Sequence, residues 1–164
     1  EAFQVIPQFF LAILIVALFG PSISRIVLVI AILSWPSTAR IVRAEFLKMR
    51  NLDFVAAARL AGANNATLIF REILPNTLPP MIVNTSLQIA GAILTEASLS
   101  FLGLGDPDIE SWGQLLYNAQ PFLRDAWWMA VFPGLAISIS ALGFNLLGDG
   151  LNDILNPRKR GQVR

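Results

Sequence analysis

Long apolar runs, separated by short polar stretches, dominate the chain and predict helices that cross a membrane. The runs cover residues 5–20, 24–42, 77–104 and 127–148. A membrane-spanning helix needs about 20 predominantly apolar residues, and each run comes close to that length. We therefore predict an all-α, polytopic helical membrane protein with about four transmembrane helices in this sequence. The link between the first two runs is so short that they should form an antiparallel hairpin.

The third apolar run carries polar side chains that set it apart from the others. Asn84, Gln88 and Glu96 are costly against lipid, so this helix should face other helices or a water-filled pathway. Asn84 and Gln88 share one face, four residues apart, and either line that pathway or bind neighbouring helices. Glu96 either lines the pathway or lies near the external interface, where it is hydrated or hydrogen-bonded.

A polar, alanine-rich stretch at residues 53–76 interrupts the apolar runs and predicts two short helices joined by a turn. Its first half has small or apolar residues at helical spacing, namely Phe54, Ala57, Ala58 and Ala61. That spacing predicts a helix with Asp53 as its N-cap. Gly62 ends this helix, and Asn64 or Asn65 caps a second one.

The second predicted helix has one apolar side and ends at Pro75. The residues on that side are Ile69, Phe70, Ile73 and Leu74. One interpretation of the whole stretch is an amphipathic hairpin lying on the lipid surface. The alanines of the first helix favour another, because small side chains permit close approach of a partner protein's backbone. We therefore predict a docking element.

The distribution of charge predicts the orientation of the chain in the membrane. Only 14% of the 164 residues are charged, against about 25% in a soluble domain, and the net charge is +1. Lys and Arg concentrate in residues 40–76 and in the tail after Gly148, whereas acidic residues concentrate in residues 106–125. Basic loops remain cytoplasmic, so we expect residues 40–76 and the C-terminus inside and residues 106–125 outside.

The sequence offers no constellation of residues for catalysis, so we expect a protein that is not an enzyme. Cysteine and histidine are both absent, which excludes thiolate and imidazole chemistry, and we predict no metal site. There is no GxxxxGK[ST] phosphate loop, and the charge gives no reason to expect nucleic acid. The first residues lack an initiator Met and a signal-peptide pattern, so the chain reads as the C-terminal part of a longer protein.

The stretch DFVAAARLAG, followed by REILPN, resembles the EAA loop of the membrane-spanning subunits of bacterial ABC importers. The residues that match this pattern at the right spacing are Ala57, Ala58, Gly62, Leu74 and Pro75. The segments TEASLSFLGLG, SWGQLL, FPGLAI and FNLLGDGLNDILNP are similar to the C-type permease of the dipeptide, oligopeptide and nickel transporter family. Ala56 stands where the pattern has Glu, a residue that could reach back to the cap of its helix or pair with a partner.

The resemblance implies a type I ABC importer permease fold, with residues 1–164 as one partial permease domain and residues 43–76 as its cytoplasmic coupling loop. It further implies ABC ATPase subunits that bind ATP and Mg, so that this chain itself binds no cofactor. A second homologous permease subunit, an extracytoplasmic solute-binding protein and the lipid bilayer are the other implied partners. The implied location is a bacterial or archaeal plasma membrane.

The resemblance also assigns roles to the loop and to the pathway. The residues that we expect to make the first contacts with the ATPase are Phe54, Ala57, Ala58, Arg59, Ala61 and Gly62. Leu74 and Pro75 should return the chain to the bilayer, while Asn84, Gln88 and Glu96 are candidates for lining the pathway. Dipeptides or oligopeptides are the implied substrates. Nickel or another small solute is the alternative within the family, and an uncoupled channel or structural subunit is the alternative outside it.

Overall fold

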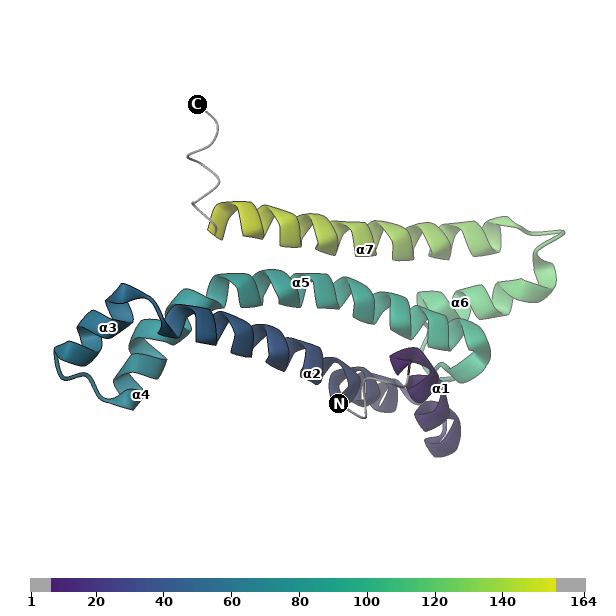
Figure 1. The fold of residues 1–164 in the computed structure, drawn as a ribbon. Helices are drawn as coiled ribbons and strands as arrows, with labels where there is room; N and C mark the ends of the chain where they lie inside the picture. Colours follow the sequence, from purple (N-terminus) through teal and green to yellow (C-terminus); the bar gives the residue numbers. More distant parts are fainter. Residues whose placement is uncertain (1–6, 156–164) are drawn as a thin grey trace, which may run out of the picture. The chain divides into compact units, whose positions relative to one another are not determined.

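The computed structural model describes residues 7–155, and all regular structure within them is helical (Figure 1). The elements are α1 (Gln8–Phe19), α2 (Ile23–Arg50), α3 (Asp53–Leu60), α4 (Asn65–Thr67), the π-helical segment η2 (Leu68–Ile73), α5 (Leu74–Leu99), the second π-helical segment η3 (Ser100–Leu104), α6 (Trp112–Ala119), the short 3-10 helix η4 (Gln120–Phe122) and α7 (Trp128–Leu155). The prediction of an all-α chain is confirmed for this part of the sequence.

Three of the described helical stretches are long and apolar enough to cross a membrane. They are the 28-residue α2, a 40-residue stretch from Asn65 to Leu104, and 27 residues of α7. At 1.5 Å per residue, each exceeds the roughly 30 Å of a bilayer core. Only 17% to 22% of the most apolar part of each is buried. Their apolar side chains therefore face outward, as expected of helices surrounded by lipid or by other membrane helices.

The first predicted span differs from the prediction. Helix α1 has only 12 residues, or about 18 Å, because Pro7 precedes it and Gly20, with φ of +86°, ends it. The expectation of about four spanning helices is thus corrected to three among residues 7–155. Pro7 and Gly20 therefore limit the length of α1, although the whole run at residues 5–20 is apolar in composition.

The chain divides into two compact units. Among the described residues, the first contains 7–35 and 88–145, and the second contains 36–87 and 146–155. Helices α2, α5 and α7 each contribute a part to both units. The boundary within α2 coincides with Pro36, which removes one backbone donor from that helix.

In the first unit, α1 folds back on the beginning of α2. Ala12 and Val16 of α1 form a buried cluster with residues from α2 and α5, namely Ile26, Val29, Leu33 and Leu99. The side-chain amide of Gln8 donates to the Leu33 carbonyl at 3.1 Å. Arg25 donates to the carbonyl oxygens of Phe19 and, at 3.0 Å, Gly20. These contacts pair the start of α1 with a later part of α2, so the predicted antiparallel hairpin is confirmed.

A carboxylate distant in sequence caps the start of α2. Asp106, which follows η3, accepts a hydrogen bond of 2.9 Å from the backbone N–H of Ile23 and one of 3.1 Å from that of Asp108. The hydrogen bond from Ile23 and then that from Asp108 hold the pKa of Asp106 below its usual 3.8, against an opposing effect of burial, and the charge of Arg25 adds the smallest contribution in the same direction as the hydrogen bonds. An anion at a helix N-terminus is favourable, so Asp106 joins the acidic loop to α2.

Helix α6 packs closely on η3 because glycines replace side chains at the contact. A Cβ atom on Gly113 would lie 2.5 Å from the Ala97 carbonyl oxygen and 2.7 Å from the Ser100 Cβ, and one on Gly105 would lie 2.6 Å from the Ser100 Oγ. Ser111 caps α6 by accepting from the Gln114 N–H at 3.2 Å. These contacts bury Ser100 to 1% exposure.

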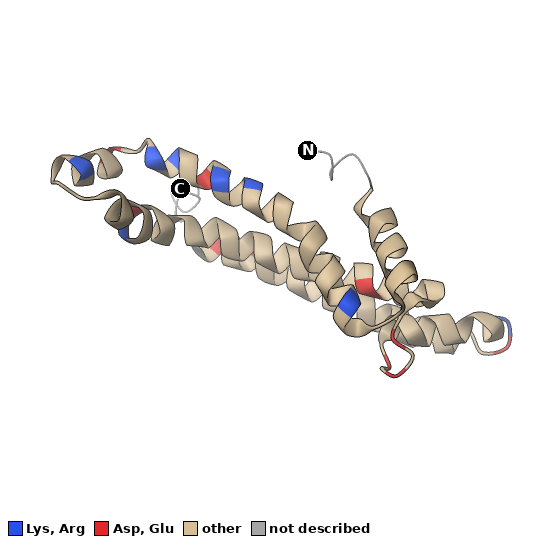
Figure 2. Ribbon diagram, turned by 90° about the horizontal axis from the view of Figure 1, so that it is seen from below, with Lys and Arg blue, Asp and Glu red and all other residues tan. Residues whose placement is uncertain are grey.

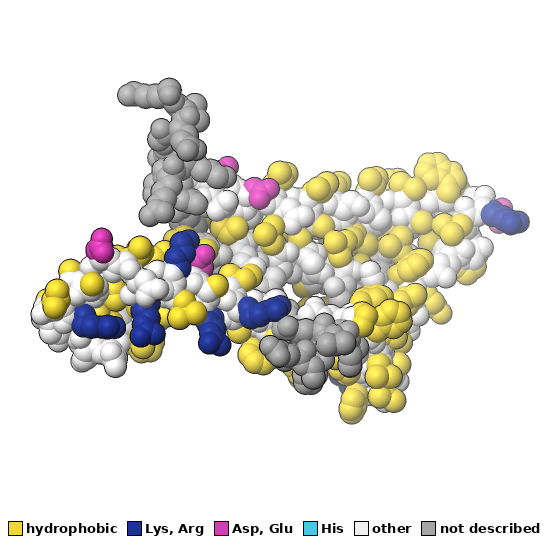
Figure 3. Space-filling model, viewed as in Figure 1, with side chains coloured by type: hydrophobic (Ala, Val, Ile, Leu, Met, Phe, Trp, Pro, Cys, Tyr) yellow, Lys and Arg dark blue, Asp and Glu magenta, His cyan; other side chains and the backbone are white. Residues whose placement is uncertain are grey.

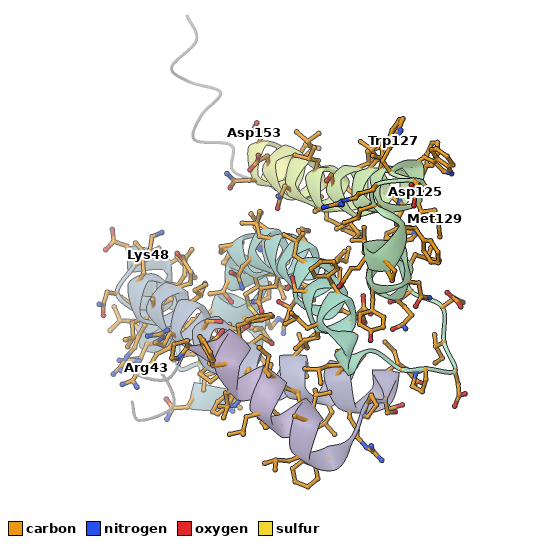
Figure 4. The ribbon with its side chains drawn as sticks, turned by 90° about the vertical axis from the view of Figure 1, so that its right-hand side faces the viewer. Arg43, Lys48, Asp125, Trp127, Met129 and Asp153 are labelled. Atoms are coloured by element: carbon orange, nitrogen blue, oxygen red, sulfur yellow. The ribbon has the colours of Figure 1, made fainter. Side chains whose placement is uncertain are left out.

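Aromatic side chains gather where α7 begins. The rings of Trp127 and Trp128 meet edge to face, with centroids 6.0 Å apart and planes at 77°. Both indoles are exposed, and Figure 4 shows Trp127 and Met129 projecting from this end of the helix, near Asp125. Exposed indoles favour the interface between lipid and water, so this end of α7 suits that position.

The hydroxyl groups of the long helices bond within their own helix. Thr85, Ser86, Thr95, Ser98 and Ser138 donate to the carbonyl four residues earlier. Ser34 and Thr77 donate to the carbonyl three residues earlier. A hydroxyl group without a hydrogen-bond partner is costly in lipid. Bonding to a carbonyl of the same helix avoids that cost, so no partner on a second helix is needed.

Replacement of Asp106 tests its role as a distant cap. Asp106→Ala should lower the melting temperature of the full-length protein at neutral pH. Because folding lowers the pKa of this carboxyl, its stabilisation is complete above 3.8 and disappears as the pH falls through the lower value in the folded state. Thermal unfolding in detergent should therefore show a difference between wild type and variant that shrinks in acid.

Asp108→Ala is the matched control for this experiment. It removes a neighbouring carboxylate but keeps the backbone N–H that donates to Asp106. An equal loss of melting temperature in both variants would contradict the capping role.

Candidate functional site

The predicted docking stretch forms a helix, a glycine turn and a second helix within the second unit, and α3 and α4 lie side by side in Figure 1. The backbone N–H of Gly62 donates to the Arg59 carbonyl at 3.0 Å, and that of Ala63 donates to the Ala58 carbonyl at 3.1 Å. This pair of bonds is a Schellman motif, which needs a left-handed residue after the helix. Gly62 supplies it with φ of +87°, so the predicted glycine turn is confirmed.

The two predicted N-caps have different outcomes. Leu52 is the N-cap of α3, and Asp53 is its first helical residue without a capping bond, so that prediction is wrong by one position. The Asp53 carboxylate still lies in the first turn, where negative charge is favourable. Asn64 does cap the second helix, because its side chain accepts from the Thr67 N–H at 2.8 Å.

A small apolar core holds the two helices of the loop together. Val55 of α3 packs with Leu68 and Ile73 of η2, and each is at most 3% exposed. The partly buried residues around them are Phe46, Met49, Ala58 and Ala63. Since Phe46 and Met49 belong to the end of α2, the core also fixes the loop to that helix. We call these seven residues the loop core.

The second helix turns only part of the predicted face inward, because Ile73 is buried and Leu74 partly buried. Leu68 and Ile73 are buried, whereas Ile69 and Phe70 are 39% and 69% exposed. The cause is the wide π-helical turn, in which the Leu74 N–H donates to the carbonyl of Ile69, five residues earlier. Residues five apart, such as Leu68 and Ile73, then share one side of the helix.

Pro75 does not end the second helix, so that prediction is also wrong. Leu74 keeps helical dihedrals, and the helix continues past Pro75 as far as Leu102, before Gly103 leaves the helical conformation with φ of +81°. Pro75 follows the wide turn directly, where the backbone is already released from the regular bonding pattern. Leu74 and Pro75 thus lie inside one helix that joins the loop to the third apolar run.

The outer surface of α3 is apolar and exposed. Phe54, Ala57 and Ala61 are exposed there, as are Arg59 and Gly62, whereas Ala58 is partly buried in the loop core. Sequence reasoning missed Leu60, which is 90% exposed. Its position, six residues after Phe54 and three after Ala57, was the available signal. We define the apolar face of α3 as Phe54, Ala57, Leu60 and Ala61.

Basic side chains lie on the loop and along the end of α2 that leads into it. They come from the end of α2, from α3 and from η2, namely Arg40, Arg43, Lys48, Arg50, Arg59 and Arg71. Figure 2 marks their positions along these helices, and Figure 3 shows several of them in a row, with hydrophobic side chains between them. Arg43 and Lys48 project from different sides of α2 (Figure 4). Lys48 forms an ion pair of 3.3 Å with Glu45.

The predicted pathway residues all lie on α5, and all are partly buried. Asn84 belongs to the second unit, and Gln88 and Glu96 belong to the first. Glu96 lines a cavity of about 600 Å³ within the first unit, and its carboxylate accepts a hydrogen bond of 2.7 Å from the Ser100 hydroxyl. Within the described residues, no group of three or more acidic side chains is arranged to hold a metal ion.

Comparison with known proteins identifies similar chains. The family model described as "Binding-protein-dependent transport system inner membrane component" matches residues 1–161. The chain is 48% identical, over 96% of its length and 54% of the relative's, to a protein of Brucella suis biovar 1 (strain 1330) named as a peptide transport system permease.

Two further relatives carry more specific names. The chain is 44% identical to the di/tripeptide transport system permease protein DppC of Pseudomonas aeruginosa (strain UCBPP-PA14) and to the dipeptide transport system permease protein DppC of Escherichia coli (strain K12). Each alignment covers 93% of this chain and 51% of the relative. The chain therefore spans about half the length of these relatives.

Substitutions at Gly62 test whether its backbone conformation fixes the loop. A Cβ atom there would meet no other atom within 4 Å, so any cost arises from the positive φ and not from a clash. Gly62→Ala should destabilise the turn by about 1–2 kcal/mol, Gly62→Val by more and Gly62→Asn by less. Limited proteolysis of the loop in the full-length protein should follow that order.

Gly134→Ala provides the control, because Gly134 lies within α7 and also has open space around a Cβ atom. It should leave proteolysis of the loop unchanged. Equal protection of the loop in all three Gly62 variants would contradict the assignment.

Proposed function

Because the chain belongs to the family of binding-protein-dependent transport system inner membrane components, we propose that the complete protein is a membrane-spanning subunit of an ATP-driven importer. The family membership confirms the resemblance found in the sequence. In this proposal, ATP and Mg are bound and used by separate ATPase subunits, and this subunit is not itself an enzyme. It forms half of the substrate pathway beside a second homologous permease.

The packing of the loop against the end of α2 is the observation that carries the proposal. Coupling requires that a displacement at the ATPase reaches the membrane helices without being absorbed by a flexible linker. The loop core fixes α3 to the end of α2, and the helix after the turn is continuous with the third apolar run. A displacement of α3 would therefore be passed both to the end of α2 and to the start of α5.

The apolar face of α3 supports protein docking over simple lipid attachment. Leu60 is 90% exposed beside alanines, a pattern that suits insertion of one large side chain into a cleft while the partner's backbone approaches closely. A surface-bound amphipathic helix would carry large apolar residues along its whole face, whereas two of the four residues of this face are alanines. We propose that this face enters the ATPase and that Phe54, Ala57, Arg59, Ala61 and Gly62 accompany Leu60.

Short peptides are the proposed substrates. The relatives named as dipeptide and di/tripeptide permeases support this class. An extracytoplasmic solute-binding protein would deliver the peptide, and nickel or another small solute remains the alternative for a member of this family. The basic residues around the loop and the acidic loop after η3 support a plasma-membrane orientation with the loop inside the cell and residues 106–125 outside.

Reconstitution tests the proposal as a whole. The full-length protein, with its partner permease, ATPase subunits and binding protein in liposomes, should take up a labelled dipeptide only when ATP is present on the side of the ATPase. An uncoupled channel would instead equilibrate the dipeptide without ATP. Uptake of nickel in place of the dipeptide would support the alternative substrate.

Docking through α3 predicts a large effect of one substitution in this helix and a small effect of another. Leu60→Asp should weaken copurification with the ATPase at least about tenfold, because burial of one Leu contributes about 1.5–3 kcal/mol. Ala56→Glu restores the residue that the EAA pattern has at this place and should change binding by less than about 1 kcal/mol, the usual range of an exposed ion pair. Quantitative pull-down of purified subunits measures both.

Leu123→Asp is a matched control, since Leu123 is also an exposed leucine, at 51%, but lies after η4 and outside the membrane-spanning helices. Wild-type affinity in Leu60→Asp, with the variant correctly inserted, would refute docking through α3.

A further inference from the structure

An open cavity of about 600 Å³ in the first unit is mostly apolar, and two glutamates, Glu96 and Glu110, belong to its lining. Its apolar wall is formed by α2 and α5, with Ile23, Val27, Ile30 and Ala31 on one side and Ala92 and Ile93 on the other. Glu96 of α5, and Glu110, Ser111 and Trp112 at the start of α6, complete the lining. All of these residues belong to one compact unit. The cavity is large enough for a small organic molecule.

The structure fixes the position of one carboxylate in this cavity. Glu96 accepts the hydrogen bond from Ser100 at 2.7 Å. Ser100 cannot move away easily, because the backbones of Gly105 and Gly113 press against it and leave it 1% exposed. Glu96 is thus presented to the cavity by a buried side chain, as a preorganised acceptor.

The lining determines the chemistry of the ligand. The lining includes two glutamates and a tryptophan, residue types that favour a cation, since an indole attracts ammonium groups through its π face. A divalent metal ion prefers a shell of several oxygens, and no group of three acidic side chains is available in the described residues. The apolar walls instead suit an aliphatic or aromatic body attached to the cation. A phospholipid phosphate would be repelled by the carboxylates.

We propose that this cavity binds a small molecule carrying a primary ammonium group on an apolar body, with Glu96 and Glu110 facing the ammonium and the α2 and α5 walls facing the body. The N-terminal ammonium of a short peptide with apolar side chains has this chemistry. Its identity as the substrate rests on the proposed function, whereas the cation preference of the cavity does not. Ser100 is the positioning residue for Glu96.

Cysteine labelling tests the cation preference without any transport. A single cysteine at Ile93, in an otherwise cysteine-free full-length transporter in detergent, places a thiol in the cavity wall. The cationic reagent trimethylammonium-ethyl methanethiosulfonate should modify it roughly tenfold faster than the anionic sulfonatoethyl reagent, relative to a control cysteine at the exposed Asn118. The combined substitutions Glu96→Gln and Glu110→Gln should remove that preference.

Protection by a defined ligand tests the site itself. Leucyl-leucinamide, which carries one ammonium and no carboxylate, should slow the labelling of the Ile93 cysteine, and N-acetyl-leucyl-leucinamide should not. Ser100→Ala should weaken this protection while keeping the cation preference, because both carboxylates remain. A merely structural role for Ser100 would change both readouts together.

Each outcome decides the proposal. Faster labelling by the cation that depends on the two glutamates, with protection by the free amine alone, supports it. Equal labelling by both reagents overturns it, as does complete lack of labelling, which would mean that another segment of the longer protein fills the cavity. ATP-dependent dipeptide uptake, measured on the same preparation, separates this result from the proposed function: normal uptake without cation preference rejects only the cavity.

Discussion

The loop core is the interaction on which the proposed coupling depends. Helix α3 has only eight residues, and an isolated helix of that length is marginal in water. Its helical state therefore requires burial of Val55 against Leu68 and Ile73. The same contact holds α3 against the second helix. Gly62 allows the chain to reverse direction between the two helices, because it adopts a positive φ that most residues avoid. Because Phe46 and Met49 take part, ordering the loop also orders the end of α2.

The helix that follows the glycine turn is continuous with the third apolar run, and this continuity connects the loop core to a membrane helix. A helix that ended at Pro75 would leave a hinge between the loop and the membrane. The wide turn at η2 instead carries the chain past the proline with the helix intact. The cost is a local departure from regular hydrogen bonding, and its consequence is that Ile69 and Phe70 turn outward while Leu68 and Ile73 turn inward. The π-helical turn thus decides both that the helix continues past Pro75 and which side chains of this segment are exposed.

What the sequence predicted, and what it missed, follows from the range of each interaction. The apolar runs, the turn at Gly62 and the cap at Asn64 depend on residues close together in the chain, and they were predicted. The cap that Asp106 provides for Ile23 spans 83 residues, so no local pattern contains it. The contact of Gly113 with Ser100 likewise appears only once α6 is folded against η3. The run at residues 5–20 was predicted as a span because its apolar composition continues across Pro7, after which the helix begins.

Ala56, which replaces the glutamate of the EAA pattern, does not deprive α3 of an N-terminal cap. With Leu52 as the N-cap, position 56 is the fourth residue of α3, one beyond the third position that a capping box requires. A glutamate there could not reach back as that motif does, so Ala56 costs the helix no cap. What Ala56 removes is at most an exposed charge, whose pairing contributes little. Leu60, by contrast, exposes nearly its whole side chain, so burial of this one residue offers docking more free energy than the missing ion pair.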